Sequence, residues 1–166
     1  RESRHMGPVA EQFHRSFGLG DDDGVIAHAD ATGVTLAAVR ALASPSRALL
    51  KLDATDMAAG VKSGELDPVA LVEASRDAIE ALNPTLNAVI TRFYDHALAL
   101  AAEARSAHDR PFAGVPYLIK DLSDYEGFRT TFGARVFEEH VSKGTAAVAG
   151  AAVASGFVPL GKTNTP

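Results

Sequence analysis

The chain has 166 residues, of which 46% are hydrophobic and 22% are charged, and its formal net charge at pH 7 is −5. This composition is typical of a globular protein with a hydrophobic core, and it excludes a disordered chain and a basic nucleic-acid-binding protein. Cysteine is absent, which excludes disulfides, thiol nucleophiles and thiolate metal sites. No apolar run is long enough to cross a bilayer, and the first residues lack the apolar segment of a secretory signal. By default we expect a cytoplasmic protein that binds neither nucleic acid nor a membrane.

Residues 1–52 differ in composition from the remainder of the chain. Glycines and aspartates gather in residues 18–24, and a short helix is predicted over residues 35–43. Because this zone shows little periodicity, we predict a weakly ordered N-terminal extension over residues 1–52 and a folded segment over residues 53–166. The first residue is not methionine and Pro166 falls in a predicted loop. We therefore expect a piece of a longer reading frame, truncated at its C-terminus.

Helix caps and periodic apolar residues define the elements from Asp53 onward. Asp53 is expected to cap a helix running to about Lys62, with Gly64 after its end. Asp67 and Pro68 open a second helix, which Asn83-Pro84 is predicted to end. The second helix has apolar and small residues on one face and charged residues on the other: Leu71, Ser75, Ala78, Ile79 and Leu82 against Glu73, Arg76, Asp77 and Glu80. A strand is predicted over residues 86–93.

The second half of the chain continues this alternation. Asp95 is expected to cap a third helix through about Ala107, and a short apolar strand follows within residues 111–121. Residues 145–155 contain no charge and almost only Ala, Val and Gly, which favours a helix buried on most sides. Residues 157–160 are predicted to be a buried strand and residues 161–166 a loop. The fold class is therefore α/β with at least a partly parallel sheet.

Lys120 directly follows the apolar residues 115–119, where a strand is expected to enter the core. Burial in apolar surroundings disfavours a charged ammonium, and a neutral lysine amine can act as a general base near pH 7. The alternative is an ordinary lysine at a strand end, with its ammonium in water and paired with Asp121. These residues alone favour the alternative, since most lysines are exposed.

Residues 112–121 read Phe-Ala-Gly-Val-Pro-Tyr-Leu-Ile-Lys-Asp, and this run resembles the segment of amidase-signature enzymes that holds their catalytic lysine. Further runs match the family in the same order: Ser-Gly-Glu-Leu at 63–66, Ile-Glu-Ala-Leu-Asn-Pro-Thr-Leu-Asn-Ala at 79–88, Thr-Thr-Phe-Gly at 130–133 and Gly-Lys-Thr-Asn-Thr-Pro at 161–166. The resemblance covers residues 53–166. It implies the N-terminal part of the family's α/β/α fold, a mixed sheet covered by helices, with Lys120 as the catalytic lysine.

The resemblance also implies a chemistry. In the family a serine attacks an amide carbonyl, a second serine relays its proton to the lysine, and backbone N–H groups stabilise the oxyanion. Both serines follow the Gly-Lys-Thr-Asn run, and Ser123, Ser142 and Ser155 lie in no Gly-Ser-Ser-Gly context. We therefore expect a hydrolase of a small-molecule amide that needs no cofactor, and an inactive chain as it stands. Substrate-binding residues are unknown, and homo-oligomerisation stays open.

Two other functions remain as alternatives. The chain resembles the amidase subunit of a tRNA-dependent amidotransferase, although Asp121-Leu122 and Thr165-Pro166 depart from that subunit's usual residues. It is otherwise a noncatalytic remnant or interaction domain, with apolar edges and faces left exposed. The family's acidic residue before its buried helix is replaced by Lys143-Gly144-Thr145.

Two further motifs are rejected as sites. Residues 156–163 satisfy the phosphate-binding pattern G-x-x-x-x-G-K-[ST], but a strand is predicted inside the motif and Pro166 follows too soon for a helix. Asp21-Asp22-Asp23-Gly24 lacks the alternating ligands of a calcium loop. No metal site is predicted, because the histidines form no cluster and are interpreted as solvated surface residues: His5, His14, His28, His96, His108 and His140.

Overall fold

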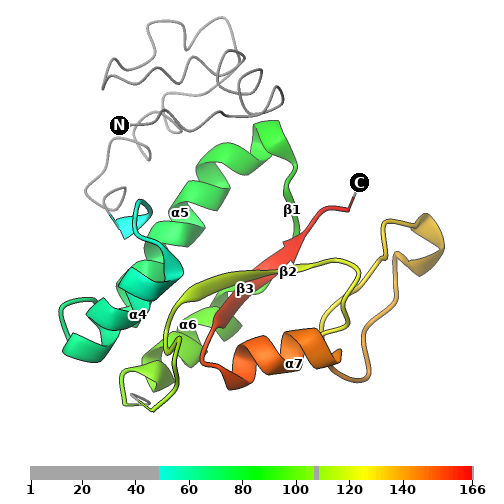
Figure 1. Ribbon diagram of the computed structural model, residues 1–166. Coiled ribbons are helices and arrows are strands. Elements are labelled where there is room, and N and C mark those ends of the chain that lie inside the picture. Colours follow the sequence, from blue (N-terminus) through cyan, green and yellow to red (C-terminus); the bar gives the residue numbers. More distant parts are fainter. Residues whose placement is uncertain (1–48, 107–108, 166) are drawn as a thin grey trace, which may run out of the picture. The chain divides into compact units, whose positions relative to one another are not determined.

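The computed structural model describes residues 49–106 and 109–165 (Figure 1). The elements, in chain order, are α4 (Ala54–Ser63), α5 (Pro68–Leu86), β1 (Val89–Arg92), α6 (Tyr94–Ala104), β2 (Pro116–Lys120), the 3-10 helix η1 (Arg135–Phe137), α7 (Ala147–Ala154) and β3 (Val158–Thr163). Nearly all of the predicted extension, the helix at 35–43 and the acidic turn at 21–24 lie outside the described residues. In the part that is described, no helix is long and apolar enough to span a membrane.

The first two helices begin where their capping residues predict. The carboxylate of Asp53 accepts hydrogen bonds from the backbone N–H groups of Thr55 and Asp56, at 2.8 and 2.9 Å. Gly64 ends α4 in the left-handed conformation, with φ at +80°, which a residue without a Cβ adopts readily. Asp67 caps α5 with Pro68 in its first turn. The predicted boundaries of α4 and the start of α5 are confirmed.

The end of α5 differs from the prediction. The helix does not stop at Asn83-Pro84 but continues to Leu86, and Asn87 closes it in the left-handed region, with φ at +47°. Pro84 lies in the last turn, and because it has no N–H the carbonyl of Glu80 lacks its helical donor there. The N–H of Asn87 donates to the carbonyl of Asn83 at 2.8 Å, so the chain turns after the proline rather than before it.

The strand and helix that follow are also placed differently. β1 is confined to Val89–Arg92, because residues up to Leu86 belong to α5. Asp95 is not the cap of α6: the helix starts at Tyr94, Phe93 is the cap position, and Asp95 lies in the first turn. An acidic side chain is favourable there because it faces the positive end of the helix dipole.

The three strands form a mixed sheet in the order β1-β3-β2. β3 is central: it pairs antiparallel with β1 and parallel with β2, with Val158 opposite Pro116 and Thr163 opposite Lys120. The predicted loop at residues 161–166 is therefore wrong for its first half, since β3 runs through to Thr163. The predicted α/β class with a partly parallel sheet is confirmed.

Helices cover both faces of this sheet (Figure 1). On one face, Val72 of α5 and Ala97 and Ala101 of α6 pack against Val158 and Leu160 of β3. On the other face, Ile119 packs with Phe93, Tyr125 and Ala149 of α7. The prediction that the alanine-rich helix is buried on most sides is wrong for the described residues, because Ala149 is its buried residue and Val148 is 62% exposed.

Candidate active site

Lys120 is the last residue of β2 and its side chain is exposed. Side chains alternate along a strand, so Lys120 points to the face opposite Ile119, which is buried under α7. Its carbonyl accepts a hydrogen bond from the N–H of Ser123 at 3.0 Å, which makes Lys120 the first residue of a turn. Within the described residues, no hydrogen bond or ion pair engages its ammonium group.

Lys162, rather than Lys120, is the buried lysine. It lies in the central strand opposite Ile119, and its side chain is fully buried. Its Nζ is 3.4 Å from Oδ1 of Asp121, whose side chain is also fully buried. Asp121 therefore pairs with Lys162, not with the neighbouring Lys120 as the alternative interpretation expected. Buried charges of this kind must be compensated, because removing either from water costs several kcal/mol.

Asp121 is held on several sides. Its Oδ2 accepts hydrogen bonds from the backbone N–H and the hydroxyl of Thr131, at 2.9 and 2.5 Å. Its own N–H donates to the carbonyl of Thr163 at 3.1 Å. Among the described residues its Oδ1 accepts no hydrogen bond. The positive charge of Lys162 therefore compensates the negative charge on this oxygen.

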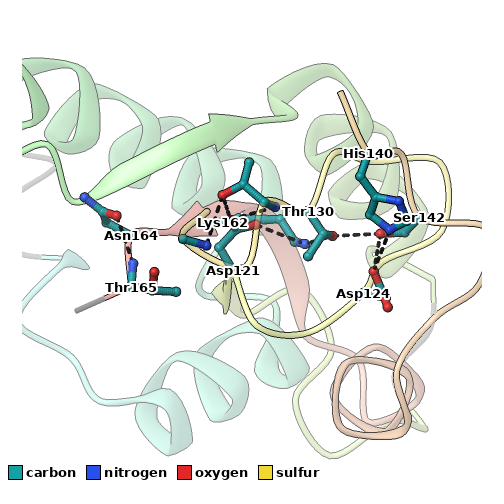
Figure 2. A network of polar contacts seen from close by, with 10 residues as sticks. Asp121, Asp124, Thr130, His140, Ser142, Lys162, Asn164 and Thr165 are labelled. Atoms are coloured by element: carbon teal, nitrogen blue, oxygen red, sulfur yellow. Dashed lines mark hydrogen bonds and ion pairs between the residues drawn. The ribbon is translucent and has the colours of Figure 1, made fainter. Parts of the chain in front are cut away.

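A run of hydroxyl groups leads from the buried Lys162 to Asp124, whose side chain is 40% exposed (Figure 2). Lys162 Nζ donates to Thr130 Oγ1, which is 2.7 Å from Ser142 Oγ, and Ser142 Oγ is 2.6 Å from Oδ1 of Asp124. Each hydroxyl has one proton and a carboxylate can only accept, so Ser142 donates to Asp124 and Thr130 donates to Ser142. The hydrogen bonds therefore run in one direction from an ammonium to a carboxylate, an arrangement in which each bond polarises the next.

These surroundings shift the pKa values of Lys162 and Asp124. Burial lowers the pKa of the Lys162 ammonium, while the carboxylates of Asp121 and Asp124 act in the opposite direction. The hydrogen bond from Ser142 holds the pKa of Asp124 below its ordinary value, partly opposed by desolvation, and the charges of His140 and Lys162 add to the lowering. His140 Nε2 lies 3.7 Å from Asp124 Oδ1, where a protonated imidazole would contact the carboxylate.

The other residues considered in the sequence have structural contacts. Ser142 is buried in the network just described, and the hydroxyl of Ser155 donates to the carbonyl of Ala151 at 2.9 Å. His96 is not a solvated surface histidine: its Nε2 lies 2.9 Å from the hydroxyl of Tyr125, against the rings of Phe93 and Phe128. His5, His14, His28 and His108 lie outside the described residues. In the described ranges, no group of three metal-ligating side chains is found.

The phosphate-binding pattern at residues 156–163 forms no phosphate loop. Its Gly161, Lys162 and Thr163 are in the central strand, and the lysine of the motif is the one buried against Asp121. The burial of Lys162 was not predicted, because residues 161–166 were expected to form a loop. One signal was present: the apolar run at residues 157–160 precedes Lys162 with only Gly161 between them, much as residues 115–119 precede Lys120.

A mixed sheet between helices, with a lysine at the carboxyl end of one strand, defines an α/β protein whose candidate site lies at that strand end. Comparison with known proteins identifies the family. The family model for Amidase matches residues 70–166. The chain therefore belongs to the amidase-signature family.

The relatives agree with this assignment. An acylamidase from Rhodococcus erythropolis is 37% identical over 120 residues, covering 69% of this chain and 25% of that protein. A glutamyl-tRNA(Gln) amidotransferase subunit from Alkalilimnicola ehrlichii is 38% identical over 113 residues, covering 66% of this chain and 23% of that protein. The structure of 6-aminohexanoate cyclic dimer hydrolase complexed with substrate matches with a TM-score of 0.63 and 38% identity, over 69% of this chain and 24% of that one. The chain thus spans about a quarter of the length of the relatives it matches.

Proposed function

We propose that the protein is an amide hydrolase in which Lys120 is the general base for a serine nucleophile. The observation that carries this proposal is the position of Lys120 in a member of the amidase-signature family. It ends β2, its side chain is exposed, and its backbone is fixed by pairing with β3 and by the turn to Ser123. A rigid backbone with an accessible amine is what a base needs in order to meet an incoming hydroxyl group.

In the proposed reaction the nucleophilic serine attacks the carbonyl carbon of the amide. Its proton passes through a second serine to the amine of Lys120, and that proton is then returned to the leaving nitrogen. Water then hydrolyses the acyl-enzyme by the same route. No serine of the sequence has the Gly-Ser-Ser-Gly context, so neither serine is assigned to a residue of this chain. The substrate is proposed to be a small-molecule amide, and the proposed location is the cytoplasm.

Substitution of Lys120 tests the proposal in the protein expressed from the complete reading frame. Lys120→Ala should lower kcat/KM for a chromogenic acyl anilide by about 10²–10⁴-fold, the usual contribution of a general base. Lys62→Ala is the matched control, because Lys62 is also exposed but lies in the last turn of α4. The 166-residue chain alone should release no product. Wild-type turnover by Lys120→Ala would refute the role of this lysine.

A second candidate is the amidase subunit of a tRNA-dependent amidotransferase. It is favoured by the 38% identity to the glutamyl-tRNA(Gln) amidotransferase subunit from Alkalilimnicola ehrlichii. The identity to the acylamidase is 37%, so sequence identity does not separate the two candidates. The assay that separates the two supplies glutamine and misacylated tRNA together with the remaining subunits of such an enzyme. Ammonia transfer to the tRNA would favour the amidotransferase, whereas hydrolysis of simple amides without a partner would favour the independent amidase.

A further inference from the structure

We infer that Lys162 is a positioning residue for the proposed base: by compensating the buried charge of Asp121, it fixes the end of β2 from which Lys120 projects. This inference rests on the function proposed for Lys120. It begins with strand register, since Lys162 lies opposite Ile119 in the parallel pair. Partners in register place their side chains on the same face of the sheet.

Asp121 continues that face. It follows Ile119 by two residues, and its carboxylate reaches Lys162 Nζ at 3.4 Å. Lys120 lies between Ile119 and Asp121 and therefore points to the opposite face. The residues on both sides of Lys120 are thus held on the face opposite to it, Ile119 by apolar packing with Ala149 of α7 and Asp121 by the ion pair with Lys162.

Asp121 also lies in the turn that follows the strand. Asp121 donates its N–H to Thr163 at 3.1 Å, and Ser123 donates to the carbonyl of Lys120 at 3.0 Å. Oδ2 of Asp121 accepts hydrogen bonds from the backbone N–H and the hydroxyl of Thr131. If the cation of Lys162 is removed, the Asp121 carboxylate is buried without compensation and must take up a proton or move toward water. Movement of Asp121 shifts the peptide bond that it shares with Lys120.

A positioning role predicts a particular kinetic change. Lys162→Met keeps the length and apolar body of the side chain and removes its charge. We expect kcat for a chromogenic acyl anilide to fall by about 10²-fold with little change in KM, as a small misplacement of a catalytic group does. The double variant Asp121→Asn/Lys162→Met removes both charges and retains an oxygen that can accept from Thr131. Its kcat should recover by at least about tenfold relative to Lys162→Met, because no uncompensated charge remains.

Hydrogen exchange supplies a readout that does not depend on activity. In the protein from the complete reading frame, Lys162→Met should accelerate amide exchange in a peptide spanning residues 120–123 by on the order of tenfold. Val72→Ala is the control for general destabilisation, because Val72 is fully buried in the cluster on the opposite face of the sheet. It should leave exchange at 120–123 and kcat near their wild-type values at a temperature where the protein is folded.

The outcomes separate the two proposals. Wild-type exchange at residues 120–123 in Lys162→Met, or a kcat no lower than that of Val72→Ala, overturns the positioning role even if Lys120→Ala is inactive. If Lys162→Met does not fold, the double variant tests the charge compensation instead. A folded double variant with kcat within about tenfold of wild type supports charge compensation. A folded double variant as inactive as Lys120→Ala overturns it. Unchanged activity of Lys120→Ala refutes the proposed function and is seen independently of the exchange result.

Discussion

Asn83 joins the end of α5 to the first residue of β1 through two hydrogen bonds. Its Nδ2 donates to the carbonyl of Val89 and its Oδ1 accepts from the N–H of Val89, both at 2.8 Å. Asn83 is 7% exposed and Val89 is 4% exposed. Asn83→Ala therefore leaves a buried N–H and a buried carbonyl without their partner, at about 1–3 kcal/mol each. Because the chain from Leu86 to Ala88 is exposed and water can approach, we expect a loss of about 3 kcal/mol.

Urea denaturation measures this loss. With an m-value of about 2 kcal/mol per molar, a loss of about 3 kcal/mol lowers the urea midpoint by about 1.5 M. Asp77→Ala is the control: the Asp77 side chain is 56% exposed and pairs with Arg76 at 3.0 Å. A surface ion pair contributes at most about 1 kcal/mol, so this midpoint should move far less.

Asn83→Asp separates the donor from the acceptor. The aspartate can still accept from the N–H of Val89, but its second oxygen faces the carbonyl of Val89 and has no proton to donate. Burial beside that carbonyl raises the pKa of the introduced carboxyl, so the folded state binds more protons than the unfolded state between the two pKa values. Stability should therefore increase as pH falls from 8 to 5, in contrast to Asn83→Ala. A midpoint for Asn83→Ala equal to that of Asp77→Ala, or no pH dependence for Asn83→Asp, would refute this account.

Two further predictions concern a glycine and the buried lysine. Gly156→Ala should lower the melting temperature more than Gly64→Ala. Both glycines have positive φ, but a Cβ at Gly156 would lie 2.7 Å from the backbone nitrogen of Ala113, whereas nothing lies within 4 Å of a Cβ at Gly64. Equal melting temperatures of the two variants would contradict this steric argument. Because burial lowers the pKa of Lys162 from its ordinary 10.5, the unfolded chain binds more protons in the interval between the lowered and the ordinary value. The urea midpoint of the wild type should therefore rise with pH toward 10.5 relative to that of Lys162→Met, and parallel pH profiles would rule out a contribution from this group.

Helix starts fixed by an aspartate cap were predicted from the sequence, and the end of α5, fixed by contacts beyond the proline, was not. Asp53 and Asp67 bind backbone N–H groups two or three residues away, so a short window of sequence contains both partners. The end of α5 depends instead on Asn83 reaching Val89 and on Asn87 adopting the left-handed region. Pro84 alone predicted an earlier stop, because its effect was judged without these contacts.

The two lysines show the same limit at the candidate site. Lys120 and Lys162 each follow a short apolar run, so the residues on either side of them do not say which one is buried. The strand order determines which lysine is buried. Lys162 lies in β3, between β1 and β2, and is fully buried, whereas Lys120 ends the outer strand β2 and points to the opposite face of the sheet. Strand order is a property of the whole sheet and is not encoded by any one segment. The resemblance to the family motif nevertheless pointed to Lys120, and the two proposals connect these lysines: the buried ion pair of Lys162 with Asp121 would fix the strand end from which the proposed base projects.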